Sequence, residues 1–84
     1  MVTILYFARL REAFGTAKEE LALPAGVANL GALRQALANR GETWAHELAQ
    51  SRQVRMAVNQ DMASTDTPVK DGDEIAFFPP VTGG

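Results

Sequence analysis

The sequence predicts an α+β fold: a mixed sheet of four to five strands, with one long helix packed across one face and one short helix. Two observations lead to this fold class. Four segments have the composition or the alternating pattern of β-strands, and a segment between the second and the third repeats leucine at helical spacing. The predicted order is strand, strand, helix, short helix, strand, strand. If the long helix connects two parallel neighbours, the crossover must be right-handed.

The chain begins with a predicted hairpin. Residues 2–8 are β-branched and aromatic, which is typical of a strand, and residues 9–15 are predicted to form a turn or a single helical turn. Residues 18–23 form a weaker alternating strand, which Pro24 and Gly26 end. We expect these two strands to pair antiparallel.

Two helices are predicted in the middle of the chain. Asn29 is a good N-cap residue, and leucines follow it at helical spacing. These leucines are Leu30, Leu33 and Leu37. Gly41 is expected to end the long helix. Trp44 and Leu48 lie four residues apart, so residues 43–50 are predicted to form a short helix that packs on the domain.

Two further strands are predicted in the last third of the sequence. Apolar residues alternate with others at Val54, Met56 and Val58. Residues 59–61 are predicted to form a turn, and residues 64–73 a polar surface loop. The last strand covers residues 74–78, and two prolines end it because proline has no backbone N–H to pair.

Side-chain parity predicts a second apolar face on the sheet. One set of alternate residues is assumed to face the helix, and the residues between them then point the other way. The helix-facing set is Ile4, Tyr6, Val54, Met56, Val58, Ile75 and Phe77. The residues between them include Leu5, Phe7, Ala57, Ala76 and Phe78. One long helix cannot cover both faces, so a patch containing Phe7, Phe78 and Met62 is expected to remain exposed as a docking surface. The alternatives are that a loop covers this face, or that the parity is shifted by one residue.

Composition excludes several classes of function. Eight basic and ten acidic residues give a net charge of −2 without a block of like charge, so nucleic acid and membrane surfaces are poor partners. No apolar run approaches the roughly 20 residues that span a bilayer, and no secretory leader is recognised, so a cytoplasmic protein is expected. The chain has no cysteine, which excludes disulfides, thiolate metal sites and a thiol nucleophile.

Isolated polar residues do not form a convincing catalytic or metal site. His46 is the only histidine, so it is interpreted as a solvent-facing helical residue. Asp71, Asp73 and Glu74 lack the spacing of a calcium loop and are interpreted as turn residues. Scattered cations could guide an acidic partner. They are Arg11, Arg34 and Lys70. No metal and no bound cofactor are expected.

The C-terminal segment has the composition of a chemically reactive tail. We divide the chain into a domain, residues 1–78, and an extended flexible tail, residues 79–84. Six residues at about 3.3 Å each can reach roughly 20 Å, far enough to enter a partner's buried site. Gly83 and Gly84 carry no side chain, so a narrow channel could close around them. A terminal carboxylate with a pKa of about 3.3 to 3.7 is a poor electrophile and would need activation, for example as an acyl-adenylate. A frayed polar terminus is the alternative.

These residues resemble a known family. Residues 71–84 are similar to the C-terminal signature of molybdopterin synthase small subunits. The likeness extends to residues 5–8, 11–12 and 15–16 at the start of the chain. It also includes residues 33–34, 44–45 and 57–60, so it covers essentially the whole chain.

The resemblance implies a ubiquitin-like β-grasp fold and a role as sulfur carrier. An adenylating enzyme similar to ubiquitin-activating enzymes would use ATP to activate Gly84, and a sulfur donor would convert it to a thiocarboxylate. The tail would then enter the large synthase subunit and give its sulfur to cyclic pyranopterin monophosphate. The implied assembly is a heterotetramer of two small and two large subunits, in which the catalytic side chains belong to the partner. The implied contacts are Phe7, Met62, Phe78, Pro79, Pro80, Val81 and Thr82, with Gly83 beside the reacting Gly84.

Two rival functions remain open. A sulfur carrier for thiamine or another thio-cofactor would share the fold and the Gly-Gly tail, although the aromatic pair and double proline before the tail favour the molybdenum pathway. The more distant alternatives are a ubiquitin-like protein modifier that forms isopeptide bonds, and an interaction domain without tail chemistry.

Overall fold

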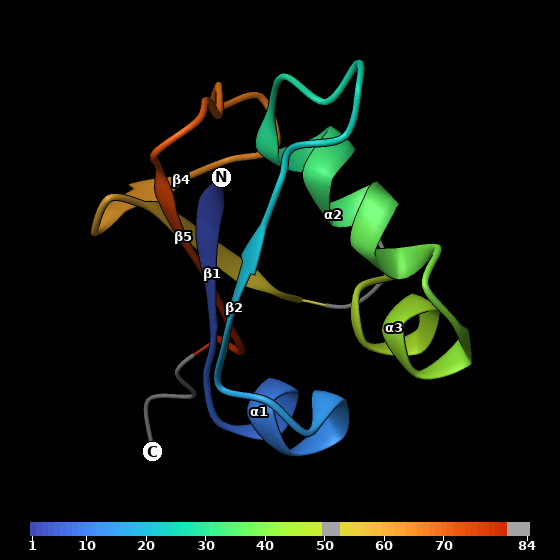
Figure 1. Ribbon diagram of the computed structural model, residues 1–84. Coiled ribbons are helices and arrows are strands. Elements are labelled where there is room, and N and C mark those ends of the chain that lie inside the picture. The colour runs from blue at the N-terminus through green and yellow to red at the C-terminus, as the bar shows by residue number, and fades with distance from the viewer. Residues whose placement is uncertain (50–52, 81–84) are drawn as a thin grey trace.

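The computed structural model describes residues 1–49 and 53–80 and has one mixed sheet with helices on one side (Figure 1). Its elements are β1 (Val2–Tyr6), α1 (Arg9–Phe14), β2 (Lys18–Leu21), α2 (Leu30–Ala38), α3 (Glu42–Glu47), β3 (Arg55–Val58), β4 (Asp61–Ala63) and β5 (Glu74–Phe78). The strand order is β2-β1-β5-β3-β4. The central neighbours β1 and β5 are parallel, and the other pairs are antiparallel. The predicted α+β class is therefore confirmed.

The N-terminal hairpin forms as predicted, with a short helix in its connection. β1 and β2 pair antiparallel, with Val2 opposite Leu21 and Leu5 opposite Lys18. The connection contains α1, which is six residues long and buries Leu10 against the core. Gly15 ends this helix in the left-handed conformation, with φ of 70°, where a residue without a Cβ has no steric penalty.

The long helix begins where the sequence predicts and ends differently. The side chain of Asn29 accepts a hydrogen bond of 2.8 Å from the backbone N–H of Ala32, so the predicted N-cap is confirmed. The predicted stop at Gly41 is wrong. α2 ends at Ala38 and is capped by Asn39 in the right-handed conformation. Gly41 is extended and precedes α3 instead, because the chain turns directly from one helix into the next.

The strand β4 is not among the four segments that the sequence indicates. Asn59 and Gln60, with φ of 51° and 72°, form a two-residue turn that joins β3 to β4. Asp61, expected in the turn, is the first residue of β4 and lies opposite Val58. Three residues are too few to show a period of two, so only pairing with β3 identifies this strand.

The core lies between the sheet and α2, and the predicted parity of the strands is confirmed. Along β1 and β5, alternate side chains are completely buried. The largest buried side chains are Tyr6, Phe77, Ile4, Leu10, Leu30, Leu33, Leu37, Leu48, Ile75 and Val2. Trp44 of the short helix is partly buried against this core and stacks on Phe14 with ring centroids 3.8 Å apart.

A polar cluster joins β1, β2 and the region after α2. The Tyr6 hydroxyl donates to Glu19 at 2.9 Å, and two nitrogens of Arg40 donate to both Glu19 oxygens at 2.9 and 2.8 Å. The hydrogen bonds from Arg40 hold the pKa of Glu19 below its usual value. Burial, together with the neighbouring Glu19 carboxylate, raises the pKa of the Tyr6 hydroxyl far above its ordinary value. In this cluster Glu19 is therefore an ionised carboxylate and Tyr6 a neutral phenol, and their hydrogen bonds stabilise the junction.

Candidate functional site

The face of the sheet opposite α2 carries a continuous apolar row. Leu5 of β1 lies opposite Ala76 of β5, Ala76 lies opposite Ala57 of β3, and Ala57 lies opposite Met62 of β4. Directly opposite residues of neighbouring strands point to the same face of a sheet. The sequence-predicted face therefore exists and extends over four strands.

An aromatic pair adjoins this row where β1 and β5 end. Phe7 is 46% exposed, and its ring meets that of Phe78 edge to face, with centroids 6.4 Å apart and planes at 83°. The Phe7 backbone N–H donates to the Phe77 carbonyl at 3.2 Å, which continues the pairing of the strands. Met62 is 61% exposed on the same face. Neither alternative for this face holds, because the parity is as predicted and no described loop covers Phe7 or Met62.

Charges on this face are separated along the strands. Lys18 lies opposite Leu5, and Arg55 lies opposite Phe78, which leads into the tail. At the other end of the strands, Glu20 of β2 and Glu74 of β5 both lie opposite Thr3. The apolar row therefore lies between a basic end near the tail and an acidic end away from it. Arg55 is not among the predicted site residues, because its position opposite Phe78 depends on strand pairing.

Ala8 holds an unusual backbone conformation next to the aromatic pair. Its φ of 53° and ψ of −126° lie in a region that favours glycine, because a Cβ there crowds the backbone. This residue links exposed Phe7 at the end of β1 to the start of α1. Strain of this kind persists only where surrounding structure enforces it, and here β1, α1 and the buried Leu10 hold both sides of the turn.

The beginning of the tail leaves the sheet beside this face. Pro79 and Pro80 follow Phe78 directly, and both are half-buried. The remaining predicted site residues lie outside the described part of the chain. They are Val81, Thr82, Gly83 and Gly84. The division into a domain and an extended tail therefore stays a prediction.

One of the expected guiding cations is structural. Arg34 is buried, and its guanidinium donates to the carbonyls of Leu48 at 2.9 Å and Ala49 at 2.7 Å. The interpretation of Arg34 as a surface cation is therefore wrong, because the end of α3 packs over it. Lys70 is exposed, and its Nζ lies 3.4 Å from Oδ1 of Asp73. Arg11 is exposed on α1.

Two other polar candidates, His46 and Asp73, have the predicted local roles, whereas Glu74, interpreted as a turn residue, is the first residue of β5. His46 is exposed on α3. Asp73 is a buried turn residue that accepts from the Lys70 backbone N–H at 2.9 Å and the Asn59 amide at 3.0 Å. These hydrogen bonds, the one from Lys70 first, keep the pKa of Asp73 below its usual value. Within residues 1–49 and 53–80, no cluster of histidine and acidic residues could hold a metal ion, and no helix could span a bilayer.

Comparison with known proteins agrees with this arrangement. A family model described as the ThiS family matches residues 4–84. The molybdopterin synthase sulfur carrier subunit of Escherichia coli (strain K12) is 46% identical over 84 residues, which cover 100% of both chains. The protein of the same name from Haemophilus influenzae is 42% identical over 84 residues, again covering 100% of both.

A solved structure shares the fold. It is the protein–protein complex of subunits 1 and 2 of the molybdopterin-converting factor from Helicobacter pylori 26695. One of its chains matches with a TM-score of 0.66 at 26% identity, covering 99% of this chain and 97% of that one. The resemblance to molybdopterin synthase small subunits, and with it the expected ubiquitin-like β-grasp fold, is confirmed.

Proposed function

The chain belongs to the ThiS family, and from this premise we propose that it is the sulfur carrier subunit of a molybdopterin synthase. The single observation that carries the proposal is the full-length likeness, 46% identical, to a carrier of that name. The arrangement of the described residues supports it. An exposed apolar face ends in the Phe7–Phe78 pair, and the strand that contributes Phe78 continues into Pro79 and Pro80.

The proposed chemistry takes place at the Gly84 carboxylate. A partner adenylyltransferase transfers AMP from ATP to this carboxylate, with loss of pyrophosphate, which converts a poor electrophile into a good one. A sulfur nucleophile at the oxidation level of sulfide then attacks the carbonyl carbon. A C–S bond forms, the C–O bond to AMP breaks, and a thiocarboxylate remains. The chain itself binds no cofactor in this scheme, and we place the reaction in the cytoplasm because it consumes ATP.

The proposed partner for sulfur donation is the large synthase subunit. The apolar row and the Phe7–Phe78 pair dock on it, while the tail, from Pro79 through Val81 and Thr82 to Gly84, enters its active site. The substrate there is cyclic pyranopterin monophosphate, and the large subunit supplies the catalytic side chains. Two such carriers and two large subunits form the proposed heterotetramer. Since each dithiolene needs two sulfur atoms, each product requires two loaded carriers.

Intact-mass analysis tests the carrier role directly. The chain is incubated with its activating enzyme, ATP and a sulfur source, and we expect the mass change of one oxygen-to-sulfur exchange, which fragmentation places at Gly84. A chain lacking Gly84 is the matched control and should remain unchanged. A lysine-linked conjugate would instead support a protein modifier, and an unchanged mass would refute the carrier role.

A second assay separates the molybdenum pathway from other thio-cofactors. The thiocarboxylated chain is mixed with the large subunit and the pterin precursor, and formation of the dithiolene is measured. We expect turnover that depends on the loaded chain. Sulfur delivery to a thiamine precursor, without delivery to the pterin, would favour the rival carrier function.

A further inference from the structure

The outer edge of β3 is only partly covered by β4. The last pair that β4 forms with β3 is Ala63 with Met56, and Gln53 and Val54 lead into β3 before its first residue, Arg55. The residue that would extend β4 opposite Val54 is Thr65. Its carbonyl instead accepts from the Gly31 N–H of α2 at 2.9 Å. The hairpin therefore leaves one position of the β3 edge open.

Strand alternation shows that the backbone of Val54 points into this opening. The Asn59 N–H donates to Glu74 on β5 at 2.7 Å, so Asn59, Ala57 and Arg55 direct their backbone groups toward β5. Val58, Met56 and Val54 must then point toward the β4 side. No backbone hydrogen bond within residues 1–49 and 53–80 involves Val54. One N–H donor and one C=O acceptor are therefore available at this edge.

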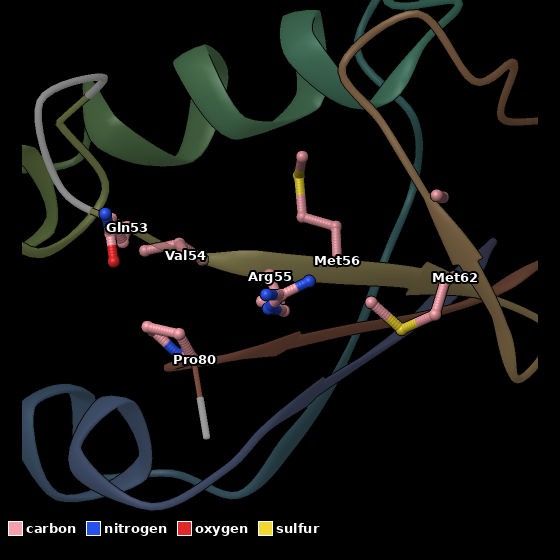
Figure 2. Close-up of a pocket in the computed structure, with 7 residues that line it drawn as sticks. Gln53, Val54, Arg55, Met56, Met62 and Pro80 are labelled. Carbon is pink, nitrogen blue, oxygen red and sulfur yellow. The ribbon is translucent and has the colours of Figure 1, made fainter. Parts of the chain in front are cut away.

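A depression of about 350 Å³ lies at the same place (Figure 2). Its lining residues come from the open edge, from β4 and from the beginning of the tail, and they are Gln53, Val54, Arg55, Met56, Met62, Ala63 and Pro80. Methionine side chains adapt to differently shaped apolar partners, and the exposed side chain of Met62 is available here. The depression adjoins the docking face, which is the face of the sheet that carries the apolar row, at Met62, and it adjoins the beginning of the tail at Pro80.

From this geometry we propose that the open edge at Val54 binds an extended segment of the large synthase subunit, which continues the line of β4. Main-chain hydrogen bonds to Val54 hold the segment, and one of its apolar side chains fills the depression beside Met62. The inference rests on the proposed function and adds to it a second contact, at the sheet edge. Because Pro80 lines the depression, the added strand also holds the beginning of the tail in its direction of exit.

The geometry favours a peptide segment over other occupants. The volume is at the lower end for a small-molecule pocket, and the unpaired N–H and C=O are the groups that an added strand requires. A protein that binds the tail lies close to Pro80, so the large subunit can contact this edge from the same bound position. Binding of the tail would not bring a second copy of this chain to the edge.

Amide hydrogen exchange on the full-length chain, free and with its large subunit, tests the proposal. The Glu42 amide is a matched control, because it is the first N–H of α3, has no partner within that helix, and lies on the side of the sheet opposite the docking face (Figure 1). We expect the Val54 amide to become protected by tenfold or more in the complex, and the Glu42 amide to keep its rate. A complex that forms and leaves Val54 unprotected overturns the edge contact but not the carrier function.

A pair of proline variants gives an independent measurement. Proline is tolerated at an edge strand where the N–H faces solvent and at the first position of a helix, so Val54→Pro and Glu42→Pro each remove one N–H that the fold does not use. Val54→Pro should weaken binding to the large subunit roughly threefold to tenfold, and Glu42→Pro should leave it unchanged. Equal affinities of the two folded variants would refute the proposal. If the unmodified chain does not bind the large subunit, the proposed function is refuted as well. If the Val54 amide becomes protected when the free chain alone is concentrated, the edge mediates self-association and the proposal is refuted.

Discussion

The strained turn at Ala8 yields a prediction that runs against the usual effect of glycine. With φ of 53° and ψ of −126°, this alanine occupies a backbone region whose cost for a residue with a Cβ is about 1 to 3 kcal/mol. Ala8→Gly removes that strain and, since the side chain is exposed, loses little buried surface. The added freedom of the unfolded chain costs about 0.4 to 1 kcal/mol. We therefore expect a net stabilisation of about 1 kcal/mol.

Thermal and urea denaturation measure this change. For 84 residues, an unfolding entropy of about 2.1 cal/mol/K per residue converts 1 kcal/mol into a rise in Tm of about 6 °C. Ala36→Gly in the interior of α2 is the matched control and should lose about 1 kcal/mol, because that alanine has ordinary helical geometry. If Ala8→Gly destabilises the protein as much as the control does, the turn is not strained and the reasoning is wrong.

Three further predictions concern ionisation, a buried cation and the docking face. Because the pKa of Glu19 is lowered in the folded state, its stabilising effect is fully present above its unfolded pKa of about 4.3 and is lost as the pH falls through the folded pKa. The difference in unfolding free energy between wild type and Glu19→Gln, measured by urea titration, should therefore shrink as the pH falls below about 4.3. Arg34→Met leaves two carbonyls without their guanidinium donor and should cost about 2 to 3 kcal/mol of unfolding free energy. Phe78→Asp places a charge in the apolar face and should weaken binding to the large subunit at least tenfold by calorimetry.

Controls separate these effects from general damage. Glu12→Gln, at an exposed position on α1, controls for the loss of one negative charge. Arg11→Met, at an exposed position, should cost less than 0.5 kcal/mol. Phe78→Leu should retain most of the affinity. A pH-independent difference for Glu19→Gln, a neutral Arg34→Met, or tight binding by Phe78→Asp would each contradict the corresponding contact.

Local patterns in the sequence were sufficient for the framework of the fold. The alternation in β1 and β5 predicts which side chains reach the core, and Asn29 marks the start of α2, because both depend on residues a few positions apart. The exposed apolar face followed from the same parity together with the scarcity of helices to cover it. The family signature in residues 71–84 indicated the carrier role, and comparison with known proteins confirmed the family.

Tertiary structure alone decided the features that depend on pairing between distant segments. Phe7 and Phe78 meet because β1 and β5 are parallel neighbours, and the pairing of β3 with β5 sets Arg55 opposite Phe78. β4 exists only as a partner of β3, and its end at Ala63 leaves Val54 open. A sequence pattern indicates the period of a helix or strand. The register between strands, and the burial of a long side chain such as that of Arg34, depend on how all the elements pack together.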